Sequence, residues 1–240
     1  SAYGLDLLIA ISPENFAYGT GFVVPSQPLM RWRHAICAVN AAGTSGIVAV
    51  DMEETTVRGK LPHSDIRIWG EFTEDPMATL AQLISDLGCE TGKVGIELSY
   101  LPTSDFQKLH ALLPKADFIA ADKIFDDLRQ IKTPEETELP HRLSRISDYA
   151  IGASFDAVTR GMTEMDIASA LTRSVYEQGA QDFKLMIVAT GPRSELPNVG
   201  PTKRILEEGD ICRVEIFSVI NGYHAGVCRT ASVGAPPKKA

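Results

Sequence analysis

The sequence has few cysteines and no long apolar run, and both absences exclude classes of protein. Its four cysteines lie far apart, with no C-x-x-C pair, so neither a zinc ribbon nor a disulfide scaffold is indicated. The longest apolar runs, such as LLIAI at 7–11, are far shorter than the roughly 20 residues needed to cross a bilayer. We therefore expect a cytoplasmic protein with reduced thiols and no membrane partner.

Basic residues are also in short supply. The chain carries 23 Lys and Arg against 31 Asp and Glu, a formal net charge of -8, and its basic residues form no run beyond Lys238-Lys239. Such a surface does not attract nucleic acid, which is excluded as an expected partner. With 240 residues and 44% hydrophobic content, the chain can bury a full core in one large domain or two of ordinary size.

Strand-like and helix-like patterns alternate in the first part of the chain. Amphipathic helices are predicted at 75–87 and at about 104–113, and strands at 5–11, 34–40, 46–52, 66–72, 93–99 and 117–124. This order indicates an α/β domain over residues 1–130. Thr133-Pro134-Glu135-Glu136 then forms a capping box that opens a new helix, so a second domain is expected over residues 131–240.

The second domain is predicted to end in a β-hairpin. A second helix at 163–178 and a strand at 183–191 precede it, and Asn221-Gly222 is a strong turn signal between strands at 211–219 and 223–233. Period-two alternation puts alternate side chains on the same face of each strand. These are Arg213, Glu215 and Phe217 on the first strand, and His224, Gly226 and Cys228 on the return strand.

This hairpin resembles the metal-binding hairpin of the creatinase, prolidase and aminopeptidase P family. The matching residues are Gly209-Asp210, Gly222-Tyr223 and Arg229-Thr230, at the spacing of the family motif. The stretches PENFAYGTG, GIELSYLP, LRQIKTPEETEL and TGPRSELPNVGPT resemble further family segments in the same order. The resemblance implies a creatinase-like N-terminal α/β domain followed by the first half of a pita-bread α+β domain, as well as a homodimer.

The resemblance also implies an activity, the hydrolysis of C–N bonds in Xaa-Pro peptides or in small amide or amidino compounds. The metallopeptidases of the family hold two divalent ions, such as Mn, Co or Zn, with two Asp from the first half of the fold and further ligands from the second. Here Glu215 stands at the first Asp position, Gly226 at the second and Asn198 at the position of a loop His. Metal binding is therefore expected to be divergent or reduced, and no metal at all remains an alternative.

Glu215 and His224 are our candidate catalytic residues, and Glu215 is also the candidate metal ligand. Asn198, Arg229 and Arg33 are candidates for substrate binding, because an amide or a guanidinium can hydrogen-bond a polar or anionic substrate. Each has a plainer alternative. Glu215 could be an ion-pair partner, His224 an ordinary strand histidine, Arg229 a structural brace, and Arg33 part of a solvated loop.

Two functions remain open. The first is a C–N hydrolase in which Glu215 and His224 act together with groups beyond residue 240, since the resemblance indicates that the chain holds only part of the pita-bread fold. The second is a non-catalytic pita-bread module that binds another protein. Fold alone cannot separate them.

Overall fold

The computed structural model describes residues 3–62 and 65–236. The chain divides into two compact units, Ser1–Ile131 and Lys132–Ala240, and each is considered by itself. Among the helices of the described ranges, none combines the length and the apolar character needed to span a membrane.

The first unit is built on a mixed six-stranded sheet with the order β4-β3-β2-β1-β5-β6. Strand β2 is antiparallel to β1 and β3, and the remaining neighbours are parallel. Its strands are β1 (Leu7–Ala10), β2 (Ile36–Asn40), β3 (Ser45–Val50), β4 (Asp65–Trp69), β5 (Lys93–Ile96) and β6 (Asp117–Ala120).

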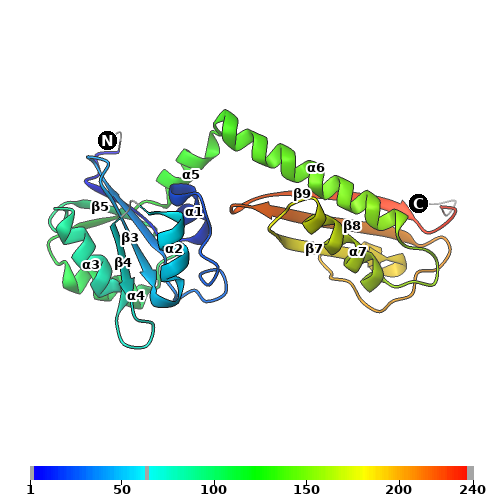
Figure 1. Ribbon diagram of the computed structural model, residues 1–240, viewed down its shortest axis with the longest axis horizontal. Helices are drawn as coiled ribbons and strands as arrows, with labels where there is room; N and C mark the ends of the chain where they lie inside the picture. The colour runs from blue at the N-terminus through cyan, green and yellow to red at the C-terminus, as the bar shows by residue number, and fades with distance from the viewer. Residues whose placement is uncertain (1–2, 63–64, 237–240) are drawn as a thin grey trace. The chain divides into compact units, whose positions relative to one another are not determined.

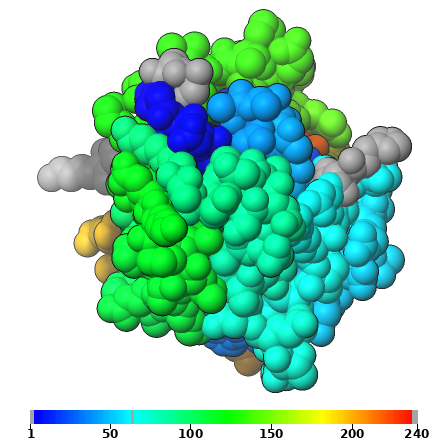
Figure 2. All heavy atoms as spheres, turned by 90° about the vertical axis from the view of Figure 1, so that its left-hand side faces the viewer, coloured from blue at the N-terminus to red at the C-terminus, as the bar shows by residue number. Residues whose placement is uncertain are grey.

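Helices cover both faces of this sheet, because its strands alternate apolar side chains to both sides. Helices α3 (Pro76–Asp86) and α4 (Thr103–Leu112) pack on one face through Leu80, Ile84 and Leu109. Figure 2 looks onto this unit, and the turquoise atoms of the α3 region cover the centre of the visible surface. The other face packs against α1 (Pro13–Thr20), α2 (Glu54–Lys60), which follows η1 (Asp51–Glu53), and α5 (Asp122–Gln130).

The predicted strand at 117–124 is wrong in its last part, which belongs to helix α5. The strand ends at Ala120 and the chain enters the helix at Asp122. The apolar run FIAA suggested a longer strand, but Ile124 and Phe125 are followed by Leu128 at helical spacing, and the first two are buried in the core. The sequence pattern also missed α2, whose single buried residue, Val57, leaves almost no apolar stripe.

The second unit is a three-stranded antiparallel sheet, β7-β8-β9, with two helices on one face (Figure 1). Helix α6 (Pro134–Asp156) begins at the predicted capping box, in which Thr133 and Glu136 bond each other's backbone amides. Helix α7 (Glu164–Glu177) follows. The remaining elements are β7 (Asp182–Thr190), η2 (Gly191–Glu195), β8 (Ile211–Ile220) and β9 (Tyr223–Ser232). The predicted fold class is confirmed.

Burial alternates along β8, and this defines two faces of the hairpin. Cys212, Val214, Ile216, Ser218 and Ile220 are buried beneath the helices, while the intervening residues are half-buried. The half-buried side therefore faces away from α6 and α7. We call it the open face.

The hairpin turn depends on two residues with positive φ. Asn221 has φ 51° and Gly222 has φ 83°. A side chain at position 222 would be strained in this conformation by about 1–2 kcal/mol. We therefore expect Gly222→Ala to lower the free energy of unfolding by about that amount in chemical denaturation.

Gly152→Ala is the matched control. A Cβ at position 152, in α6, would meet nothing within 4 Å, so this variant should be neutral or stabilised by up to about 1 kcal/mol. Equal effects of the two substitutions would contradict the assigned turn.

Candidate functional site

The open face brings together residues from both strands of the hairpin. Strand pairing places Glu215 opposite Cys228, Phe217 opposite Gly226 and Val219 opposite His224. Side chains of paired residues lie on the same side of a sheet, so the two predicted faces coincide. Glu215 and His224 are not neighbours, however, because the Phe217–Gly226 pair lies between them. Four residues along a strand span about 13 Å, too far for a shared proton.

The Phe217 ring occupies the space above Gly226. A Cβ at position 226 would overlap three ring atoms, and its distance to Cε2 of Phe217 would be 2.7 Å. Real Cβ atoms do not approach other atoms this closely, so the ring would have to move to admit a side chain. The Phe217 ring can therefore take this position because residue 226 has no side chain.

Glu215 places a carboxylate on the open face. Within residues 3–62 and 65–236, no hydrogen bond or ion pair engages that carboxylate, and Glu215 is half-buried. Its charge acts on the cysteine opposite. Burial first, and then the negative charge of Glu215, raise the pKa of the Cys228 thiol. Cys228 therefore remains a neutral thiol at neutral pH.

Arg213 shares the open face with Glu215 but does not neutralise it. Its Nη2 atom donates to the carbonyl oxygens of Leu196 and Pro197, the latter at 3.0 Å. This fork holds the loop between η2 and β8 against the sheet. Asn198, which is exposed, follows directly, so the backbone leading to it lies beside the open face. The sequence pattern placed Arg213 on this face and gave no sign of its contact with the loop.

Glu164, a fully buried carboxylate in the first turn of α7, binds both ends of the segment 190–202, which comprises η2 and the first part of this loop. One carboxylate oxygen accepts from the backbone and hydroxyl of Thr190, both at 2.9 Å. The other accepts from the backbone and hydroxyl of Thr202, at 2.9 and 2.6 Å, and from Arg193. Burial acts to raise the pKa of Glu164, but hydrogen bonds from Thr202, Arg193 and Thr190 outweigh it and the pKa is lowered.

A second ion pair holds the part of the chain that follows Thr202. Arg204 donates through both terminal nitrogens to Asp210, and its Nη1 also reaches the Thr190 hydroxyl at 2.9 Å. Burial acts to raise the pKa of Asp210, but the Arg204 guanidinium holds it below its usual value. Gly191 has φ 52° and passes directly against this pair, where a Cβ would collide with both side chains.

Arg229 does not lie on the open face, and Arg33 belongs to the first unit. Arg229 pairs with Val214 in the ladder, which puts it on the helix side, and it forms an ion pair of 2.7 Å with Asp148 on α6. Arg33 belongs to the first unit, where its Nε donates to Glu71 at 2.7 Å. The structure thus brings Glu215, His224 and the loop before Asn198 to one face, and does not bring Arg229 to it.

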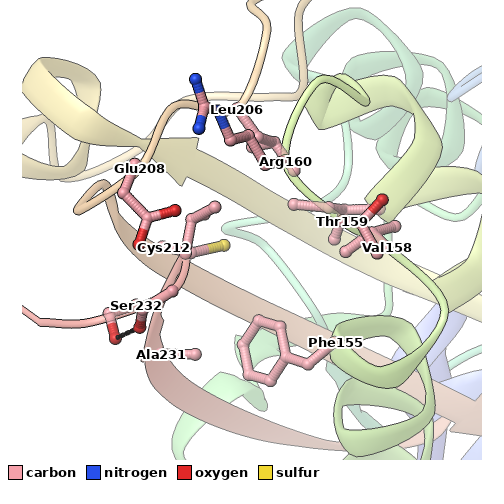
Figure 3. Close-up of a pocket in the computed structure, with 12 residues that line it drawn as sticks. Phe155, Val158, Thr159, Arg160, Leu206, Glu208, Cys212, Ala231 and Ser232 are labelled. Carbon is pink, nitrogen blue, oxygen red and sulfur yellow. Dashed lines mark hydrogen bonds between the residues drawn. The ribbon is translucent and has the colours of Figure 1, made fainter.

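A separate pocket of about 330 Å³ opens on the helix side of the sheet. Figure 3 shows the Cys212 thiol directed into it, with Phe155 and Val158 from α6 and the following loop on one wall and Glu208 and Arg160 at the edge. Burial, with smaller effects of Glu164 and Asp210, raises the pKa of Cys212 to about 12. The thiol is therefore no nucleophile at neutral pH. None of the predicted site residues lines this pocket.

Comparison with known proteins identifies the family. Residues 1–131 match the sequence model of the creatinase/prolidase N-terminal domain, and residues 139–240 match that of metallopeptidase family M24. The chain belongs to the creatinase/prolidase family. The predicted resemblance is thereby confirmed.

Several of the proteins to which this chain is similar are named Xaa-Pro dipeptidases. An Xaa-Pro dipeptidase of Pyrococcus furiosus is 28% identical over 207 residues, covering 82% of this chain and 58% of its own length. One from Lactobacillus delbrueckii subsp. lactis is 24% identical and covers 98% of this chain and 64% of its own length. The X-Pro aminopeptidase of Thermotoga maritima has the same fold, with a TM-score of 0.83 at 22% identity over 99% of this chain and 64% of its own. The chain thus spans less than two thirds of these relatives.

The family name implies divalent metals, but the hairpin of this chain does not fit them. Residues 3–62 and 65–236 contain no group of three or more His, Cys, Asp or Glu side chains placed to hold a metal ion. Gly226 offers no ligand atom, and the apolar Phe217 ring fills the adjoining space. Divalent ions need several oxygen or nitrogen donors at about 2.0–2.6 Å. Among the open-face residues of the described hairpin strands β8 and β9, Glu215 is the only carboxylate.

We expect Glu164→Gln to destabilise the second unit by about 3 kcal/mol at neutral pH, because it leaves Arg193 and two threonines without their anion. The folded-state pKa of Glu164 is lowered, so its contribution is present above the unfolded value of about 4.3 and is lost as pH falls through the folded value. The difference between wild type and variant should therefore shrink below about pH 4. Denaturant unfolding at neutral and acidic pH measures it.

Glu177→Gln, on the exposed end of the same helix, is the control and should change stability by less than about 0.5 kcal/mol. A Glu164→Gln variant that is as stable as this control at pH 7 would show that Glu164 does not fasten the loop.

Proposed function

We propose that the chain is part of a hydrolase of C–N bonds that acts on a small peptide, in the manner of Xaa-Pro dipeptidases, or on a small amide or amidino compound. The support is the family match over both units, together with an open hairpin face that keeps one carboxylate, Glu215, and the loop that leads to Asn198. The active protein is proposed to be a cytoplasmic homodimer.

In this proposal Glu215 supplies the acid–base chemistry. Its carboxylate accepts a proton from a water molecule as the water oxygen bonds to the substrate carbon. It then returns that proton to the nitrogen as the C–N bond breaks. One carboxylate can serve both steps because the proton it gains is the proton that the leaving nitrogen requires. Asn198 is proposed to hydrogen-bond the substrate.

His224 and Arg229 have smaller parts in the proposal. The distance along the strands keeps His224 from exchanging a proton with Glu215 directly, so it is proposed to contact a more distant part of the substrate. Arg229 is proposed to brace the sheet against α6 through Asp148. Arg33 remains a candidate for binding a substrate carboxylate.

The metal requirement follows from the same geometry. Since this hairpin supplies one carboxylate and an aromatic ring where metallopeptidases have two carboxylates, the proposed enzyme uses a divalent ion weakly or not at all. Metal content of the purified full-length protein, measured by elemental analysis, is expected to be well below two ions per chain.

A non-catalytic binding module is the second candidate, and one observation favours it. The Phe217 ring over Gly226 removes a metal-ligand position without restoring another reactive group in its place. Binding of a protein partner without turnover of any tested amide would support this alternative.

Replacement of the Glu215 carboxylate tests the hydrolase directly. In the full-length protein we expect Glu215→Gln to lower kcat/KM at least about 100-fold, because removing a general base has effects of 10²–10⁴. Hydrolysis of a panel of Xaa-Pro dipeptides, small amides and amidines is followed by amine release.

Glu177→Gln provides the matched control and should retain wild-type kcat/KM. If Glu215→Gln also retains it, Glu215 has no place in the reaction. A wild-type protein that turns over nothing in the panel would favour the binding module.

A further inference from the structure

The open face carries two aromatic rings that take no part in the proposed proton transfers. The centroids of the Phe217 and His224 rings are 6.2 Å apart and their planes are inclined by 48°. Both helices of this unit pack on the opposite side of the sheet, so the outer surfaces of these rings are not covered by α6 or α7. Phe217 is half-buried and His224 is exposed. The pair is an aromatic surface fixed by strand register.

A carboxylate lies beside these rings. Glu215 is two residues from Phe217 on the same face, and its carboxylate has no ion-pair partner in the part of the chain that the structure describes. Arg213 lies two residues beyond Glu215 on the same strand, and its guanidinium is directed to the loop carbonyls of Leu196 and Pro197. An aromatic ring presents a negative π surface. The Glu215 carboxylate and the Phe217 ring therefore favour the same kind of ligand, a cation.

The donor atoms on the face indicate which kind of cation it can bind. A metal ion needs several close oxygen or nitrogen donors, and the Phe217 ring stands where a second donor would be. A cation whose charge is spread over carbon substituents has no such need, because it gains from contact with ring faces and from a single nearby carboxylate. Alkylated ammonium groups are bound in this way by aromatic side chains.

We propose that the open face binds an alkylated ammonium group, with its carbon substituents on Phe217 and His224 and its charge beside Glu215. The inference goes beyond the proposed hydrolase, because such a group can be part of a substrate or of a ligand that is bound without reaction. It identifies Phe217 as the residue that selects an organic cation over a metal ion.

Tetramethylammonium chloride is the probe. Its binding to the full-length protein is measured by NMR titration at constant ionic strength, with sodium chloride as the reference salt. Saturable binding is expected for the wild type. Phe217→Leu keeps an apolar side chain but removes the π surface, and should weaken binding about fivefold. Glu215→Gln, which removes only the charge, should weaken it by a similar factor.

Phe183→Leu is the matched control, since Phe183 packs with the core on the helix side. It should bind the probe as the wild type does, and circular dichroism establishes that each variant is folded. The inference is overturned if wild type shows no saturable binding, or if Phe217→Leu binds as tightly as the control. It is also overturned if manganese chloride displaces the probe at equal concentration.

These outcomes are separable from those of the hydrolase. Binding of the probe with no turnover of the amide panel would leave this inference standing and remove the hydrolase. Turnover that depends on Glu215 without binding of tetramethylammonium would do the reverse.

Discussion

The contact between the Phe217 ring and the backbone of Gly226 is the constraint on which the open face depends. Because the two residues are paired across the hairpin, the ring and a side chain at 226 compete for one volume. The ring has that volume, so the open side of the described hairpin strands has one carboxylate, Glu215, and an aromatic surface beside it. Both the poor fit to a divalent metal and the fit to an organic cation follow from this contact.

A second constraint fixes the loop beside that face. Glu164 is buried and would be unfavourable there as an isolated charge, but it receives five hydrogen bonds, including one from Arg193. The bonds from Thr190 and Thr202 join the two ends of the segment 190–202. Arg213 donates to carbonyl oxygens in the middle of that segment. The position of Asn198 thus depends on side chains from α7 and β8 that are distant in sequence.

Local sequence signals predicted much of the fold. The Asn221-Gly222 turn and the Thr133 capping box are formed by neighbouring residues, so their chemistry is visible in a short stretch. The strand period predicted which residues share a face on each strand, and the observed register shows that the two faces coincide. Helix α2 was missed because its single buried residue, Val57, leaves weak periodicity, and α5 was missed because the apolar run before it indicated a longer strand.

The candidate site was predictable in part. Its location followed from the hairpin, and the family resemblance drew attention to Glu215, Gly226 and Asn198. The contact of Phe217 with Gly226 depends on a ring position that no sequence pattern specifies. Glu164 likewise looked like an ordinary acidic residue near a helix start, because its partners lie 26 to 38 residues away. Tertiary contacts of this kind are not written in local spacing.

A double-mutant cycle on the free energy of unfolding tests the central contact most directly. Gly226→Ala should destabilise the protein by about 1–3 kcal/mol, since the added methyl group overpacks against the ring. In a Phe217→Ala background the same change should have little effect, giving a coupling of at least about 1 kcal/mol. If the two substitutions are additive to within about 0.3–0.5 kcal/mol, the ring does not occupy the space above position 226 and this account of the open face is wrong.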